Sequence, residues 1–154
     1  MFVALVALCA GIGLFSDNAF FSSSNIFNTE RQIAMLGIFA IGVSFVIATG
    51  GIDLSVVGIA NMTSIGAAVV MLSLAPRGAD ASTSAVAIAL AVVSALVAGT
   101  AAGALNGFLV AKIKIPAILV TLGTFELFTG IAILITGGKP KSGLPPLYGQ
   151  TFAG

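Results

Sequence analysis

One acidic side chain, Asp53, lies between two long stretches of sequence, residues 33–49 and 56–75, that contain no charge. A carboxylate at the centre of a bilayer costs about 2.5–3.5 kcal/mol on insertion scales, so it is expected to face a cavity or another protein group. Gly50 and Gly51 precede it, and adjacent glycines favour a break in a helix. This short polar segment therefore predicts an interrupted helix with a polar site at membrane depth.

Further polar side chains extend the candidate site along neighbouring apolar stretches. Ser55 and Asn61 follow Asp53 within two turns, and Asn106 lies near the end of a later stretch. Buried amide and hydroxyl groups must find hydrogen-bond partners, so ordinary contacts between helices are one interpretation. The other is one wall of a polar pathway, because broken helices with freed backbone groups form such sites. For Asn106 the structural role is favoured over contact with a solute.

Two other features sit at membrane depth. Glu126 lies near the middle of residues 115–136, where the sequence offers few cationic partners, so it pairs with a group outside the chain or is protonated by desolvation. Gly99, Gly103 and Gly107 are spaced four apart, a pattern that lets a second helix backbone approach closely. Ordinary helix packing is the favoured interpretation, and a helix that lines a permeation path is the alternative.

The composition argues against an enzyme or a nucleic-acid-binding protein. The 154 residues include no histidine and a single cysteine, and the net charge is +1 without a basic patch. No nucleophile–base pair, metal-ligand cluster or phosphate-binding loop followed by Lys and Ser/Thr is present. We therefore expect no catalytic residues, no metal and no cofactor in this chain, and any ATP hydrolysis must come from another chain.

Hydropathy indicates the fold class. The chain is 58% hydrophobic and 7% charged, against about 25% charged residues in soluble domains. Its mean hydropathy is +1.19. We predict an all-α integral membrane protein, a single transmembrane domain over residues 1–154 with a broken helix near residues 50–55. About five spans are expected, near residues 2–15, 33–49, 56–75, 85–111 and 115–136.

The segments between and after the spans are predicted to be connections. Residues 2–15 lack the positive start of a signal peptide and are read as a helix, residues 16–32 as a polar connection, and residues 137–154 as an irregular tail. The tight basic turn at Lys112 and Lys114 favours a cytoplasmic N-terminus by the positive-inside rule, although the remaining basic residues argue the other way.

Several segments, taken in order, resemble a known family. Residues 50–56, Asn106-Gly107, Ile115-Pro116 and residues 121–124 are similar to the membrane permease subunits of ribose-type sugar importers of bacteria. These are the branched-chain-amino-acid/ribose-type permeases of ATP-binding-cassette systems. The resemblance covers about residues 15–146. Because such permeases are longer, it implies that this chain is an N-terminal half.

The resemblance implies a multi-pass protein of the bacterial plasma (inner) membrane that forms part of the pathway for a monosaccharide such as ribose or a similar polar solute. The implied partners are a second permease subunit, identical or not, cytoplasmic ATPase subunits that use ATP, and a periplasmic or extracellular sugar-binding protein. Two alternatives remain: a stand-alone ion-coupled carrier that uses Asp53 and Glu126, and a non-transporting membrane assembly protein built on the three glycines.

Asp53 has two possible roles in such a conduit. It can contact the solute, or it can brace the helix break by accepting backbone hydrogen bonds. The brace is favoured because a bare carboxylate would hold a sugar too tightly for release, and because freed backbone donors need acceptors.

Overall fold

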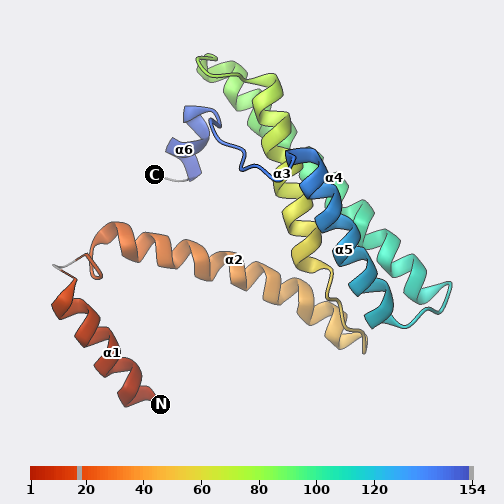
Figure 1. Ribbon diagram of the computed structural model, residues 1–154, viewed down its shortest axis with the longest axis horizontal. Helices are drawn as coiled ribbons and strands as arrows, with labels where there is room; N and C mark the ends of the chain where they lie inside the picture. Colours follow the sequence, from red (N-terminus) through yellow and green to blue (C-terminus); the bar gives the residue numbers. More distant parts are fainter. Residues whose placement is uncertain (17–18, 153–154) are drawn as a thin grey trace. The chain divides into compact units, whose positions relative to one another are not determined.

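The computed structural model describes residues 1–16 and 19–152, and the regular elements in these ranges are six helices (Figure 1). The chain divides into two compact units, Met1–Phe45 and Val46–Gly154. The helices are α1 (Phe2–Phe15), α2 (Ser23–Ala48), α3 (Val56–Leu74), α4 (Ala81–Ala111), α5 (Ala117–Thr136) and α6 (Pro146–Phe152).

Four of these helices, α2 to α5, are long and apolar enough to cross a membrane. The prediction of a polytopic helical membrane protein is confirmed in this respect. The helix α1 has the predicted bounds, but its 14 residues fall short of the roughly 20 needed to cross a hydrocarbon core. The number of helices with full spanning length is therefore four among the described residues, where about five were expected.

The second helix begins earlier than predicted. It starts at Ser23, not near residue 33, so part of the expected polar connection is helical. Its first turn is held by polar groups: the Ser22 hydroxyl accepts from the Asn25 backbone N–H at 3.3 Å, and the Asn25 side-chain amide donates to the Phe20 carbonyl at 2.7 Å. Apolar length alone marks only the part of a helix that suits the membrane, so the prediction missed this polar start.

The tail after α5 also contains a helix that was not predicted. It begins at Pro146, a position where proline costs nothing because the first N–H of a helix has no partner within the helix. The connection before it passes Gly143, which has a positive φ of 87°. A side chain at Gly143 would collide with the Arg77 guanidinium, whose Nε lies 2.8 Å from the ideal Cβ position. The tail thus returns to the turn between α3 and α4.

In the first unit, aromatic side chains pack between the end of α1 and the start of α2. The rings of Phe20 and Phe21 meet edge to face with their centroids 5.0 Å apart. The Phe21 ring also occupies the space beside Gly13 of α1, where a side chain would not fit.

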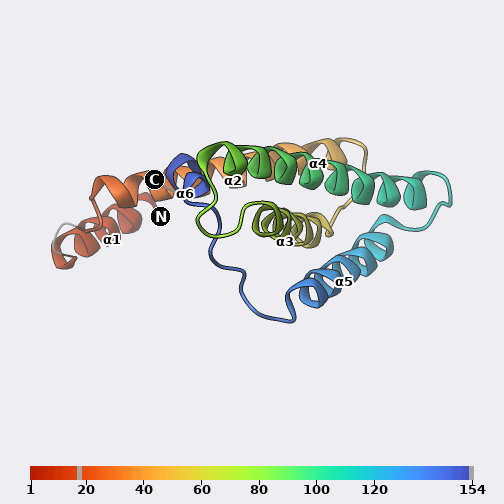
Figure 2. The same cartoon turned by 90° about the horizontal axis from the view of Figure 1, so that it is seen from above.

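In the second unit, α3 packs against both α4 and α5 (Figures 1 and 2). The α4 surface that becomes buried consists of small residues. Gly99 lies on this side, because an ideal Cβ built there would be 3.7 Å from the Thr63 side chain of α3. Ideal Cβ positions at Gly103 and Gly107 have no atom of a neighbouring element within 4 Å. The structure therefore brings one of the three glycines to α3. The buried α4 residues are Ser84, Ala87, Ala91, Ala102 and Asn106.

The turn before α4 ends in a carboxylate cap. Asp80 accepts hydrogen bonds from the backbone N–H groups of Ser82 and Thr83, each at 3.1 Å, and from both of their hydroxyls. These bonds, the one from the Ser82 hydroxyl first, hold the pKa of Asp80 well below its usual range. They satisfy N–H groups that a helix start leaves without partners.

The helices α3 and α5 approach each other closely at Gly58. An ideal Cβ at this position would lie 2.8 Å from the Phe125 carbonyl oxygen and 3.1 Å from its Cα. Both atoms belong to the backbone of α5 and cannot turn away as a side chain can. Glycine is therefore required here for the two helices to pack at this distance.

We predict that Gly58→Ala lowers the free energy of unfolding by about 1–3 kcal/mol, because α3 and α5 must separate to admit the methyl group. Unfolding of the purified protein in mixed micelles, followed by helix content, measures this quantity. Gly66→Ala is the matched control on the same helix, since nothing lies within 4 Å of its Cβ position. It should cost nothing and can stabilise by up to about 1 kcal/mol. Equal losses in the two variants would contradict the packing argument.

Candidate functional site

The connection between α2 and α3 separates two helices of membrane-spanning length. Gly50 has a positive φ of 77°, and its N–H donates to the Ile47 carbonyl at 2.9 Å. The Gly51 N–H donates to the Val46 carbonyl at 3.1 Å. This is the usual way in which a left-handed glycine ends a helix and satisfies its last carbonyls. The helix break that the sequence predicts at these glycines is therefore present in the structure.

Asp53 lies within this break and is hydrogen-bonded to Ser55, the residue immediately before α3. Its Oδ1 accepts a hydrogen bond from the Ser55 backbone N–H at 2.7 Å and another from the Ser55 hydroxyl at 2.6 Å. The carboxylate also sits beside the N-terminal end of α3, where a negative charge is favourable. This arrangement is the geometry that a brace of the break requires.

Ser55 connects the break to α4. Its hydroxyl is fully buried and accepts a hydrogen bond from Asn106 Nδ2 at 2.7 Å, across 51 residues of sequence. Because the Ser55 hydrogen is already donated to Asp53, Asn106 must present its NH₂ group here and not its carbonyl. The side chains thus form one directed chain of hydrogen bonds, from Asn106 through Ser55 to Asp53. We call these three residues the break cluster.

Asn106 retains one unused hydrogen-bonding group. The residue is only 4% exposed, and its Oδ1 has no hydrogen-bond partner among the described residues. A buried amide oxygen without a partner is uncommon and costly.

A threonine of α5 also reaches the break. The Thr121 hydroxyl lies 2.8 Å from the Ala117 carbonyl within its own helix and 3.4 Å from the Ile52 carbonyl in the break. Thr121 is 2% exposed, and Thr124, one turn later, is 7% exposed. The sequence analysis did not select these threonines as site residues. Two features of the sequence could have identified them: both carry a hydroxyl group in an otherwise apolar stretch, and their spacing puts both on one side of a helix.

Other predicted site residues lie outside the break cluster. Asn61 is exposed on α3, and its carbonyl accepts from the Ser64 hydroxyl. Glu126 is exposed on α5. Their roles in a pathway remain predictions. In the described part of the structure, neither side chain forms a hydrogen bond with Asp53.

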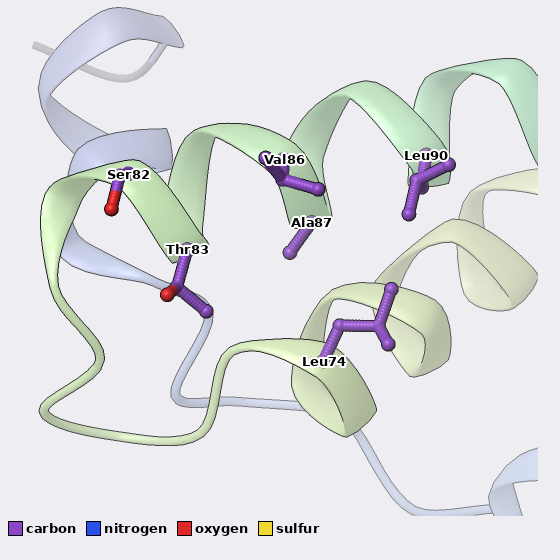
Figure 3. A pocket seen from close by; sticks show the side chains of 6 residues that line it. All are labelled: Leu74, Ser82, Thr83, Val86, Ala87 and Leu90. Carbon is purple, nitrogen blue, oxygen red and sulfur yellow. The ribbon is translucent and has the colours of Figure 1, made fainter.

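Three pockets lie along α3, α4 and α5, with volumes of about 340, 360 and 260 Å³. Figure 3 shows the first, beside the start of α4, where Leu74, Val86 and Leu90 provide an apolar lining next to two hydroxyl side chains. None of these three pockets includes a residue of the break cluster. Within the break cluster, Ser55 and Asn106 are buried and Asp53 is half-buried.

Comparison with known proteins identifies relatives over most of the chain. Residues 25–151 match the family described as branched-chain amino acid transport system / permease component. The ribose import permease protein RbsC of Haemophilus influenzae is 36% identical over 140 residues, 90% of this chain and 39% of that protein. The autoinducer 2 import system permease protein LsrC of Yersinia enterocolitica is 36% identical over 145 residues, 93% of this chain and 36% of that protein.

A third relative is named as an import permease for other sugars. The xylose/arabinose import permease protein XylH of Sulfolobus acidocaldarius is 33% identical over 128 residues, 83% of this chain and 35% of that protein. The chain thus spans well under half the length of these relatives. No solved structure matches it. The extent of these matches shows that the chain belongs to the branched-chain amino acid transport system permease family.

Proposed function

We propose that these 154 residues form part of the membrane permease of an ATP-binding-cassette importer for a monosaccharide or a similar polar solute. Family membership supports this proposal, as do relatives named as import permeases for ribose, xylose/arabinose and autoinducer 2. Four helices of membrane-spanning length provide the necessary scaffold. Multi-pass insertion in the bacterial plasma membrane follows from the same proposal.

The observation that carries the proposal is the break cluster between two spans. Interrupted membrane helices expose backbone groups, and such irregular backbone is tolerated where it is buried in protein or lines a solute path. Here the carboxylate of Asp53 is engaged by Ser55, which in turn is held by Asn106. Both bonds from Ser55 are accepted by Oδ1, so we assign this carboxylate the role of holding the interruption in place and not that of binding the solute. Weak polar contacts along the path then allow the solute to leave again.

In this proposal, partner proteins supply the energy for transport and select the solute. Separate ATPase subunits bind and hydrolyse ATP, since the sequence contains no phosphate-binding loop of its own. A second permease subunit, identical or not, completes the pathway, and an external binding protein delivers the solute. Ribose-type sugars are the first solutes to test.

We predict that uptake by the complete importer requires ATP and continues when the proton gradient is collapsed. The test is accumulation of radiolabelled ribose in proteoliposomes that contain the permease, its ATPase and its binding protein. Omitting ATP should reduce uptake to the level of empty vesicles, and an uncoupler should leave it unchanged. Uptake that an uncoupler abolishes while ATP is abundant would instead indicate an ion-coupled carrier.

We predict that Asp53→Ala destabilises the permease by about 1–3 kcal/mol, because the buried Ser55 hydroxyl loses the group to which it donates. Asp53→Asn is the matched control, since its side-chain oxygen can still accept both bonds from Ser55. The amount of folded protein in the membrane and the apparent KM for uptake are measured in both variants. If Asp53 acts as a brace, only the alanine variant should be less abundant, and the apparent KM should change little in either variant. A normally abundant Asp53→Asn variant with a much higher KM would show that the carboxylate contacts the solute.

A further inference from the structure

Glu126 is an ionisable side chain midway along a membrane-length helix. It lies on the exposed side of α5, and no residue in the described ranges forms a hydrogen bond or an ion pair with it. Charged side chains at this depth are rare and are almost always turned towards other protein groups or a wet cavity. The exposed side of α5 around Glu126 is therefore not a surface that can face lipid.

The residues around Glu126 indicate whether protein or water surrounds this side chain. Leu122 and Ile133, one turn before and two turns after Glu126 on the same side of α5, are 46% and 55% exposed. Gly123 and Gly130 have nothing within 4 Å of their Cβ positions. A wall of a wet path would carry several exposed polar side chains, whereas Leu122, Gly123, Gly130 and Ile133 offer none beside Glu126, and the hydroxyl of the nearby Thr129 is buried. This face fits a second helix that approaches closely and supplies one polar partner.

The chain itself does not supply a cation at this depth. Its six basic residues flank the apolar stretches: Arg31 in the early part of α2, which already has an interaction of its own, Arg77 before α4, Lys112 and Lys114 before α5, and Lys139 and Lys141 after it. A second copy in the same membrane orientation would bring another Glu126 to the same level, which is a like charge. The complementary partner is therefore a helix of different sequence.

We propose that the face of α5 formed by Leu122, Gly123, Glu126, Gly130 and Ile133 docks a membrane helix from outside residues 1–154, and that this helix carries an Arg or Lys that pairs with Glu126. Charge complementarity at mid-membrane depth argues for this occupant, and the two glycines provide room for its backbone. The inference concerns assembly and does not depend on which solute is transported.

The test places a photo-cross-linking amino acid, p-benzoylphenylalanine, at Ile133 in the native host, with the same substitution at the exposed Val93 of α4 as a position control. After irradiation, cross-linked peptides are identified by mass spectrometry and normalised to the amount of protein in the membrane. The expected product at Ile133 joins α5 to one membrane helix with a basic residue in its middle. Val93 should not yield that peptide.

Substitutions of Glu126 test whether the yield of the cross-linked product depends on this side chain. Glu126→Leu should lower the yield of this product roughly three- to tenfold, the range expected when one interhelical polar contact is lost. Glu126→Asp should largely retain it, which controls for general damage to α5. The proposal is overturned by lipid adducts alone, by a product that joins two copies of residues 1–154, by a partner helix without Arg or Lys, or by a yield that does not respond to Glu126→Leu.

Discussion

The hydroxyl group of Ser55 is the point on which the arrangement of the second unit depends. It is fully buried, it donates to Asp53 in the helix break, and it accepts from Asn106 on α4. Each of these polar groups would be costly to bury alone, because the hydrocarbon core of a membrane offers no water to replace a missing bond. Linked one to the next by hydrogen bonds, these groups fix the position of the start of α3 relative to α4. The nearby contact of Thr121 with the Ile52 carbonyl adds α5 to the same point.

Packing around this junction relies on small residues, for a reason specific to membranes. Lipid tails are as apolar as leucine, so burying large hydrophobic side chains gives helices little reason to associate. Close backbone contact supplies the attraction instead. The alanines of α4 and Gly99 give α3 a smooth surface, and Gly58 lets α3 reach the backbone of α5. Many of the large side chains, including Leu96, Leu119 and Leu134, remain outside, as is appropriate for a surface that meets lipid or further helices.

The sequence was sufficient to predict features whose causes are local. The charge-free stretches predicted the membrane helices, and Gly50 and Gly51 predicted the break, since a left-handed helix end needs glycine. The start of α2 and the helix α6 were missed because hydropathy does not report polar caps or a proline at the first helical position. The choice of Gly99 over Gly103 and Gly107 as the contact with α3, and the arrival of Thr121 at the break, depend on how helices rotate against one another. Spacing along one helix does not contain that information.

The two sets of bonds at Ser55 differ in how far apart their partners lie in the chain, and this affects the order of folding. The bonds between Ser55 and Asp53 span two residues and can form as soon as this segment leaves the ribosome. The bond from Asn106 spans 51 residues, so it must wait until nearly all of α4 has been synthesised. The break is therefore shaped before the helix that locks it exists. A nascent chain paused between these two points would already hold the turn, with Ser55 still able to accept a different donor.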